Sequence, residues 1–401
     1  MRALVALILT IVLAAPLPAR ADAAFERWLD ETAWPAAAQA GVDRAAFERL
    51  TRGLTPDFTL PGLAAAGGVP ARDSQAEFAA PERYFNEASL RALATQGRAL
   101  AEKHGPLLAR LERETGVPGR IVLAIWGRES AYGRAAIPHD ALRVLATRGF
   151  AGTRRPLFTA EFAKALVIAE ETGLSLRASW GGAMGQPQFL PSSYLAHARD
   201  GDGDGRADIW GSEADTLASI AGYLADKGWV AGSDWGYEIT LPESVPCTRN
   251  GPDQAKRIFK WEEDGVVRVS RRPFPVNERR VDGFLVLPAG TQGPAFMATP
   301  NFTVLKAYNE SDLYALFVGN LADRIAFGAT AFQGAWAPTD AMTRGHVARA
   351  QERLVRLGYD VGGANGLIGN KTRRAVGLWQ ESQGLTPTCF PDRALLEALL
   401  R

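Results

Sequence analysis

The spacing of apolar residues along the chain separates a long helical region from a shorter strand-rich one. From about residue 24 to residue 173 apolar residues recur every three to four positions, most clearly at 89–116 and 158–173. That period is typical of amphipathic helices. The same period returns at 301–325. The main body of the protein is therefore predicted to be helical.

A different pattern runs from residue 237 to residue 286. Short segments rich in valine, isoleucine and aromatic residues are separated there by glycine and proline, which is typical of strands joined by turns. The segments are YEITL (237–241), RIFKW (257–261), GVVRVS (265–270) and GFLVLP (283–288). We expect them to form a small β-rich insertion in the helical body.

The last part of the chain is predicted to be a separate helical module. Residues 332–340 lose the helical pattern and are interpreted as a linker, and residues 341–401 are close to the smallest size that folds independently. Two sets of residues fall on single helical faces, on either side of a glycine-rich loop. They are Val347, Gln351, Leu354 and Leu357, then Thr372, Val376, Trp379 and Gln380.

The N-terminus has the pattern of a secretory signal peptide. Arg2 precedes an apolar run at 3–15, and Ala21-Asp22-Ala23 fits a cleavage site of the small-x-small type. The run is too short to span a bilayer comfortably, and no cysteine follows it to carry a lipid. Residues 1–23 are therefore expected to be removed. The exported protein is expected to be a soluble periplasmic monomer with no stable membrane anchor.

Composition and charge argue against several classes of function. Of the 401 residues 47% are hydrophobic and 22% charged, and the net charge of +1 lacks the basic field that nucleic-acid binding needs. The four histidines and two cysteines show no zinc-ligand spacing, so a zinc hydrolase is not expected. Cys247 and Cys389 could pair in an exported protein or both stay free, and the sequence leaves this open.

Glu129 is the first candidate for chemistry, because it lies in the apolar helical stretch IVLAIWGRESAYG (121–133). At 100° per residue it is about 20° from Val122 and about 40° from Ile125, so it shares the buried face. One interpretation is structural, an ion pair with an arginine or a cap on a neighbouring helix. The other is a general acid, because burial destabilises a charged carboxylate and raises its pKa.

A glycine-rich segment, SWGGAMGQPQFLPSSY (179–194), follows about fifty residues later. Its glycines would let a ligand approach the backbone, and its two glutamines offer hydrogen-bond donors and acceptors. Trp180 could stack on the face of a sugar. Taken alone, the segment is also explained as a turn before a helix.

Together the two segments resemble the membrane-bound lytic transglycosylase B family, peptidoglycan-cleaving enzymes with a lysozyme-like core. The likeness rests on GRESAYG (127–133) and GAMGQPQFLPSSY (182–194), with TRRPLF (153–158) between them and PNFTVLKAYNESDLYALFVGNLADR (300–324) after them. It covers residues 24–331. The founding members are lipoproteins, and the lipid-bearing cysteine is absent from this chain.

The resemblance implies a reaction that one carboxyl group can perform. Glu129 would protonate the oxygen that bridges MurNAc and GlcNAc, and its carboxylate would then accept the C6 hydroxyl proton as that oxygen attacks C1. The product would be a 1,6-anhydro-MurNAc end, with no water consumed and no cofactor needed. No second carboxylate that would partner Glu129 is obvious from the sequence, in contrast to a conventional two-acid glycosidase.

The resemblance also implies which residues bind the glycan near Glu129. Core packing is an alternative explanation for the tyrosines among them, and surface ion pairs for the arginines. The residues are Ser179 and Gln188 for sugar N-acetyl or hydroxyl groups, Tyr308, Asn309 and Tyr314 for lining the cleft and orienting the acid, and Arg154 and Arg155 for peptide-stem carboxylates.

The loop DGDGDGRADIW (200–210) has the spacing of a calcium-binding loop. Aspartates stand at its first, third, fifth and ninth positions and a glycine at its sixth, as in an EF-hand. The twelfth position, normally glutamate, is Gly211, so a later carboxylate would complete the site. The predicted ligands of a structural Ca²⁺ are Asp200, Asp202, Asp204, the Arg206 carbonyl, Asp208 and Asp215. The alternative is a solvated turn loop without metal.

The C-terminal module resembles a three-helix peptidoglycan-binding domain. The match runs through ARAQERLVRLGYDVGGANGLIGNKTRRAVGLWQESQGL (348–385) and stops at TPTCFPD (386–392), where the usual glycine-containing turn is replaced. The module would hold the enzyme on an insoluble polymer and raise the local substrate concentration. A helical module without a ligand is the alternative.

The sequence therefore predicts an exported lytic transglycosylase that acts on the glycan strands of peptidoglycan. A signal peptide (1–23) precedes a mainly α, lysozyme-like catalytic domain (24–331), a linker (332–340) and a peptidoglycan-binding domain (341–401). The nearest alternative is a hydrolytic muramidase on the same fold. A non-catalytic wall-binding scaffold would be a different class of protein.

Overall fold

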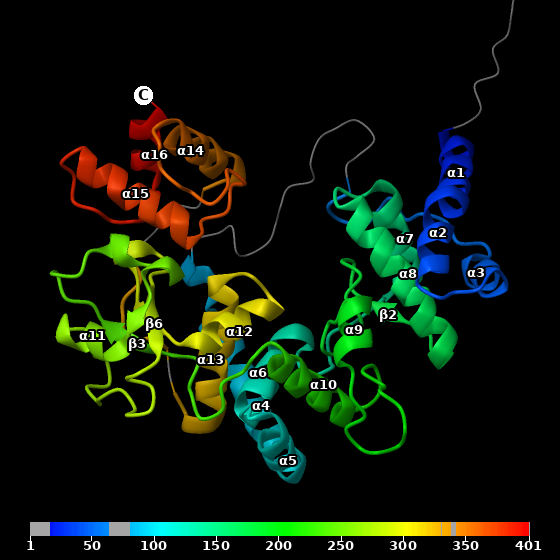
Figure 1. Cartoon of the computed structure of the whole chain (residues 1–401), viewed down its shortest axis with the longest axis horizontal. Helices are drawn as coiled ribbons and strands as arrows, with labels where there is room; N and C mark the ends of the chain where they lie inside the picture. The colour runs from blue at the N-terminus through cyan, green and yellow to red at the C-terminus, as the bar shows by residue number, and fades with distance from the viewer. Residues whose placement is uncertain (1–16, 64–80, 330, 338–341, 401) are drawn as a thin grey trace, which may run out of the picture. The chain divides into compact units, whose positions relative to one another are not determined.

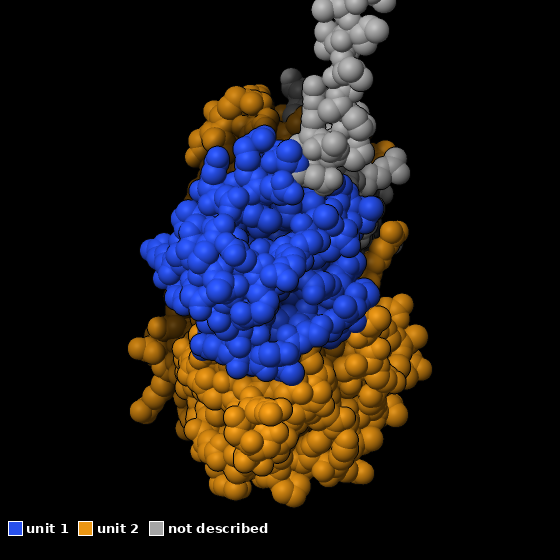
Figure 2. Space-filling view, turned by 90° about the vertical axis from the view of Figure 1, so that its right-hand side faces the viewer, with its two compact units in different colours: residues 1–71, 137–185, 189–195 blue, residues 72–136, 186–188, 196–401 orange. Residues whose placement is uncertain are grey.

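The computed structural model of the chain describes residues 17–63, 81–329, 331–337 and 342–400, and helices predominate in it (Figure 1). Most of the predicted signal peptide and part of the predicted linker lie outside these ranges. Within them, no helix is both long and apolar enough to cross a membrane. The chain forms two compact units, which Figure 2 distinguishes by colour.

Unit 1 is assembled from three segments of the chain, residues 1–71, 137–185 and 189–195. Its core contains an aromatic cluster, in which Phe25 stacks on Trp28 with ring centroids 5.6 Å apart. Its elements are α1 (Leu17–Trp28), η1 (Leu29–Ala33), α2 (Trp34–Gln39), α3 (Arg44–Thr51), β1 (His139–Asp140), α7 (Ala141–Ala151), α8 (Arg155–Thr172), β2 (Arg177–Ala178) and the start of α9 (Pro191–His197).

Unit 2 is built around α6 (Gly119–Ser130), in which every residue from 121 to 127 is buried. Arg120 near its start pairs with Asp323 at 2.7 Å. The helices that pack on α6 are α4 (Glu87–Lys103), α5 (Gly105–Thr115), α10 (Glu213–Asp226) and α13 (Asp312–Phe327). The short η3 (Pro81–Tyr84) precedes them, and α12 (Pro300–Tyr308) leads into α13.

The predicted β-rich insertion is an antiparallel five-stranded sheet in the order β4-β6-β7-β3-β5. The central strand β7, whose four residues are all buried, shows no alternating pattern and was not predicted. The elements are β3 (Gly236–Thr240), η4 (Cys247–Arg249), η5 (Pro252–Gln254), β4 (Lys256–Arg257), α11 (Ile258–Glu263), β5 (Val267–Arg268), β6 (Asp282–Val286), η6 (Gly290–Gln292) and β7 (Ala295–Ala298).

The prediction of a strand at RIFKW (257–261) is wrong, because only Arg257 of this segment is in a strand and α11 follows it. Ile258 and Trp261 are both fully buried, and a spacing of three residues places both on one side of a helix. The Trp261 indole also donates a hydrogen bond to the Gly283 carbonyl at 2.9 Å. Tertiary packing therefore makes most of this segment helical, although its composition favours a strand.

The C-terminal module has the three helices that were predicted, α14 (Arg344–Arg356), α15 (Asn370–Ser382) and α16 (Arg393–Leu400). Leu354 and Trp379 belong to its hydrophobic core. Leu357 was expected on the buried face of the first helix. It is 43% exposed instead, because α14 has already ended at Arg356.

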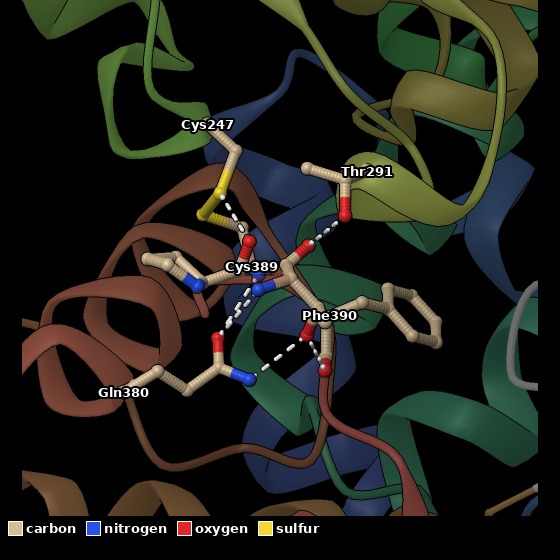
Figure 3. The surroundings of a disulfide bond; sticks show 7 residues. Cys247, Thr291, Gln380, Cys389 and Phe390 are labelled. Carbon is tan, nitrogen blue, oxygen red and sulfur yellow. Dashed lines mark hydrogen bonds between the residues drawn. A yellow bond between two sulfur atoms is a disulfide. The ribbon is translucent and has the colours of Figure 1, made fainter. Parts of the chain in front are cut away.

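A disulfide joins Cys247 of the insertion to Cys389 of the C-terminal module (Figure 3). Their Cα atoms are 6.0 Å apart, and 142 residues separate them in sequence. On the module side, Gln380 Oε1 accepts hydrogen bonds from the amides of Thr388 and Cys389. The pairing that the sequence left open is therefore present, and it uses the segment 386–392 where the module departs from its family pattern.

Candidate active site

Glu129 lies in the last turn of α6, and the chain leaves that helix through an unusual turn. Ala131, Tyr132 and Gly133 have left-handed φ values of 50°, 60° and 76°. This conformation costs a residue with a side chain about 1–2 kcal/mol. Hydrogen bonds hold it in place, since the Tyr132 hydroxyl donates to a carbonyl of α4 at 2.9 Å and Ser130 Oγ accepts from Gly133 N at 3.0 Å. The backbone strain lies directly beside the candidate acid, as is common at functional sites.

The carboxyl group of Glu129 accepts a hydrogen bond from a buried phenol. Tyr314 Oη on α13 lies 2.6 Å from Glu129 Oε1, and Tyr314 is only 1% exposed. Burial, followed by the negative charge of Glu129, raises the pKa of Tyr314 well above its ordinary value. The phenol therefore stays protonated and remains a donor that orients the carboxyl. The structure thus brings together Glu129 and Tyr314, as the resemblance implied.

Tyr308 supports this arrangement from the end of α12. Its ring is nearly parallel to that of Tyr314, with centroids 6.3 Å apart and planes 11° apart. Its hydroxyl donates to the Pro187 carbonyl at 2.7 Å, which connects α12 to the glycine-rich segment. Burial, followed by the charge of Glu129, also raises the pKa of Tyr308 well above its ordinary value. One buried and one half-buried phenol, Tyr314 and Tyr308, therefore lie in the electrostatic field of one carboxylate.

Gln186 attaches the glycine-rich segment to α6. Its Oε1 accepts from the Trp126 indole at 2.9 Å, and its Nε2 donates to the Trp210 carbonyl at 3.0 Å. A Cβ atom on Gly133 would lie 2.4 Å from Gln186 Oε1, so a glycine is required there. Gln188, a predicted sugar ligand, is half-buried and has a left-handed φ of 55°. Gln186 itself was not among the predicted site residues, because its partner lies 60 positions away in sequence.

Three predicted site residues belong to unit 1. Ser179 closes a tight turn, in which its amide donates to the Ala183 carbonyl at 2.8 Å. Arg154 lies over the Phe158 ring at 5.4 Å, and both Arg154 and Arg155 are exposed. Among the residues that the structure describes, neither arginine forms an ion pair with a carboxylate. The roles of all three side chains in substrate binding remain predictions.

Asn309 lies between α12 and α13. Its Oδ1 accepts a hydrogen bond from Ser311 N at 3.1 Å, which stabilises the loop just before α13. It also lines a cavity of about 410 Å³ between this loop and the C-terminal module. That Asn309 lines the cleft and helps to orient Glu129 remains a prediction.

Three of the predicted metal ligands are close together. Asp200, Asp202 and Asp204 are exposed, and one carboxylate oxygen from each lies within 4.8 Å of the others. The Asp200 carboxylate also accepts from the amides of Gly205 and Gly203, which lowers its pKa. The loop is therefore held in a shape that gathers three negative charges.

Two other predicted metal ligands, Asp215 and Asp208, accept hydrogen bonds from backbone amides in and next to the loop. The carboxylate of Asp215 is buried and accepts from the amides of Gly201 and Asp208, both at 2.7 Å. Burial raises the pKa of Asp215, and the charges of Asp202 and Asp200 raise it further. Asp208 Oδ1 accepts from the amides of Trp210 and Gly211. The remaining predicted ligand is a main-chain carbonyl, that of Arg206.

These features define a class of protein: a lysozyme-like helical domain with one tyrosine-held acid at the end of its central helix, joined to a three-helix module. Residues 24–323 match the family model described as the transglycosylase SLT domain, and residues 343–399 match that of a putative peptidoglycan binding domain. The chain belongs to the transglycosylase SLT family. The expected family, the lysozyme-like fold and the C-terminal module are confirmed.

Known relatives resemble the chain to different extents. Membrane-bound lytic murein transglycosylase B of Escherichia coli is 32% identical over 215 residues, which are 53% of this chain and 58% of that protein. The chain thus spans little more than half the length of this curated relative. SltB3 from Pseudomonas aeruginosa, in complex with NAG-anhNAM-pentapeptide, is 34% identical with a TM-score of 0.82, covering 94% of this chain and 99% of that one.

Escherichia coli Slt35, whose structure is a complex with calcium, is more distant. It is 24% identical with a TM-score of 0.58, and the match covers 78% of this chain and 94% of that one. At this identity the likeness concerns the fold.

Proposed function

We propose that the protein is a lytic transglycosylase that cleaves the MurNAc-β-1,4-GlcNAc bond of peptidoglycan and leaves 1,6-anhydro-MurNAc ends. The observation that carries this proposal is the 2.6 Å hydrogen bond from buried Tyr314 to Glu129, at the end of an apolar helix. It holds an acid in one orientation, as general acid–base catalysis requires. The complex of SltB3 with NAG-anhNAM-pentapeptide supports an anhydro product here.

One carboxyl group can perform both proton transfers of this reaction. Protonated Glu129 gives its proton to the bridging oxygen, and the bond between that oxygen and C1 of MurNAc breaks. The carboxylate then takes the proton of the C6 hydroxyl of the same sugar while O6 bonds to C1. Glu129 ends the cycle protonated, and water is neither consumed nor released. The use of one carboxyl group and no water distinguishes the reaction from a hydrolysis with two catalytic carboxylates.

Tyr314 supports the charged state of Glu129 that appears midway through the cycle. A hydrogen bond donated to a carboxylate favours its ionised form. Because one oxygen of Glu129 is held by the phenol, the rotation of the carboxyl group is also restricted. Tyr308, which stacks on Tyr314, restricts that phenol in turn.

The proposed contacts with the substrate extend beyond the acid. Gln188 combines a polar side chain with a left-handed backbone within the glycine-rich segment, and such strain is often found at ligand sites. Ser179 and Asn309 would bind sugar groups. Exposed Arg154 and Arg155 would bind the carboxylates of peptide stems through charge-assisted hydrogen bonds.

The rival functions are less well supported. A hydrolytic muramidase would have to activate a water molecule, usually with a second carboxylate. A wall-binding scaffold would have no use for a carboxyl group held by a buried phenol beside a strained turn. The arrangement of Glu129, Tyr314 and the turn at 131–133 favours the transglycosylase over both.

We also infer that the protein works outside the cytoplasm, as a soluble periplasmic monomer, on the insoluble wall. The Cys247–Cys389 disulfide supports this compartment, since such bonds persist in oxidising environments. The C-terminal module would keep the catalytic domain close to glycan strands and so raise the local substrate concentration.

The aspartate loop is proposed as a structural calcium site without a part in the reaction. The donor set fits, because Asp200, Asp202 and Asp204 offer oxygen ligands close together, and Ca²⁺ prefers oxygen ligands in flexible geometry. Three carboxylates this close repel one another, and a bound cation would relieve that repulsion. Arg206, Asp208 and Asp215 are the proposed further ligands.

The exchange Glu129→Gln tests the proposed acid with little change of shape. The amide still accepts the hydrogen bond from Tyr314 but has no acidic proton, so release of soluble fragments from purified peptidoglycan should fall at least about 100-fold. The melting temperature should not change. Glu112→Gln, on the exposed face of α5, is the matched control and should stay within about twofold of the wild type. Undiminished release by the Glu129 variant would overturn the assignment.

A further inference from the structure

The C-terminal module is part of unit 2, and more contacts than the disulfide hold it to the rest of that unit. Thr291 N donates to the Thr388 carbonyl at 2.9 Å. Figure 3 shows the side chain of Thr291 next to the bridge. A Cβ atom on Gly377 of α15 would lie 2.7 Å from Cγ2 of Thr248 in η4, so α15 is in close contact with the insertion. These contacts place α15 in one position relative to the insertion. The same helix carries two neighbouring arginines, one paired with the start of α13 and the other with η5.

Arg373 reaches from α15 to the start of α13. Its side chain is 3% exposed, and its Nη2 lies 2.6 Å from Oδ2 of Asp312. The other oxygen of Asp312 is 2.8 Å from the Lys306 ammonium of α12. Burial alone would raise the pKa of Asp312, but the charges of Arg373 and Lys306 hold it below its ordinary value. Asp312 is therefore an anion fixed between two cations, one of which comes from the module.

The Lys306–Asp312 ion pair lies close in sequence to both active-site tyrosines. Lys306 is two residues before Tyr308, and Asp312 is two residues before Tyr314. The Lys306–Asp312 contact thus connects the last turn of α12 to the first turn of α13. A shift of Asp312 would move the start of α13, and with it the phenol that donates to Glu129. Displacements of about 1 Å in a positioning group can cost a catalyst about 100-fold in rate.

Arg374, the next residue of α15, provides the contrast. It pairs with Asp253 of η5 at 3.2 Å, at the partly exposed edge of the β-rich insertion. It therefore fastens the module to the β-rich insertion, and in the described structure it forms no hydrogen bond or ion pair with α12 or α13. If the two arginines served only to fasten the module, their loss should have similar consequences for catalysis.

We propose that Arg373 is a positioning residue of the catalytic site, which acts through Asp312 to hold Tyr314 against Glu129. The inference rests on the proposed function, since it concerns the same acid. It gives the C-terminal module a part in turnover that is separate from capturing the wall. The catalytic domain is therefore complete only when the module is docked.

The test compares the kcat values of variants at saturating substrate. Under this condition kcat does not depend on how well the module captures the glycan. The substrate is soluble, uncross-linked peptidoglycan strands. Arg373→Met should lower kcat about tenfold and leave KM within about twofold. Arg373→Lys, which keeps the charge, should recover most of the loss. The matched control Arg374→Met should leave both constants within about twofold.

A double variant separates positioning from general damage. If Arg373 acts through Tyr314, adding Arg373→Met to Tyr314→Phe should lower kcat little further, because interacting residues are not additive. If the Arg373→Met variant does not fold, the same comparison is made with Asp312→Asn, which keeps the shape of the side chain. Equal kcat for the Arg373 and Arg374 variants, or multiplicative losses in the double variant, would overturn the inference. A wild-type protein that leaves the strands uncut would overturn the proposed function itself.

Discussion

Individual residues differ in how far their roles could be predicted from the sequence. Helix phase predicted that Glu129 shares the buried face of its helix, and in the structure this residue is half-buried. The contact with Tyr314 was implied only by family resemblance, since 185 positions separate the two residues. Gln186 shows the limit of local reasoning. Its hydrogen bond to Trp126 depends on how the glycine-rich segment returns to α6, which no local pattern encodes.

Gly133 gives a prediction at this scale. Its φ is 76°, and a Cβ atom there would lie 2.4 Å from Gln186 Oε1, so Gly133→Ala adds both backbone strain and a clash. We expect a loss of about 2–4 kcal/mol in the free energy of unfolding, measured by urea titration. Gly173→Ala is the matched control, because its φ is 64° but nothing lies within 4 Å of the added atom. It should cost about 1 kcal/mol. Equal losses would contradict the proposed close approach of Gln186.

At the scale of elements, α6 and α13 form the frame of the site. They are fastened at two levels, Arg120 to Asp323 at one end and Glu129 to Tyr314 at the other. The two contacts are nine positions apart on each helix and pair in reversed order, so the helices run antiparallel with matched register. The acid and its phenol are therefore held by a rigid pair of helices.

Periodicity predicted the helices well and the small sheet less well. Amphipathic helices such as α4 and α5 repeat their pattern over several turns, so the period is clear. The strands have two to five residues, too few for a period to emerge, and β7 is buried throughout. At 257–261 an apolar pattern that suits a strand equally suits one turn of helix, and only the surrounding core decides between them.

The aspartate loop gives a prediction for one element. A cation that binds only the folded protein must stabilise it, so millimolar Ca²⁺ should raise the melting temperature and a chelator should reverse the effect. Asp204→Asn should abolish the response, because it removes one of the three gathered carboxylates. Asp226→Asn, an exposed aspartate of α10 outside the loop, should retain it. A melting temperature that is indifferent to Ca²⁺ and chelator would contradict the proposed site.

At the scale of the whole molecule, the sequence predicted the kinds of parts but not how the module is attached. Cys247 and Cys389 are 142 residues apart, and their pairing depends on where the module docks. The departure at 386–392 looked like a loss of the family pattern. In the structure that segment holds Cys389 and faces the insertion, so it has a structural use. In the chain-entropy model, a disulfide that closes so long a loop raises the free energy of the unfolded chain by about 5 kcal/mol.

The central claim is that this molecule breaks the glycan with one carboxyl group and without water. The direct test is mass spectrometry of fragments released from purified peptidoglycan by the full-length protein, in water enriched in heavy oxygen. We predict fragments with 1,6-anhydro-MurNAc ends, each one water lighter than a hydrolysis product and free of the heavy isotope. Fragments with reducing ends that carry heavy oxygen would contradict the claim and assign the fold to a hydrolytic muramidase.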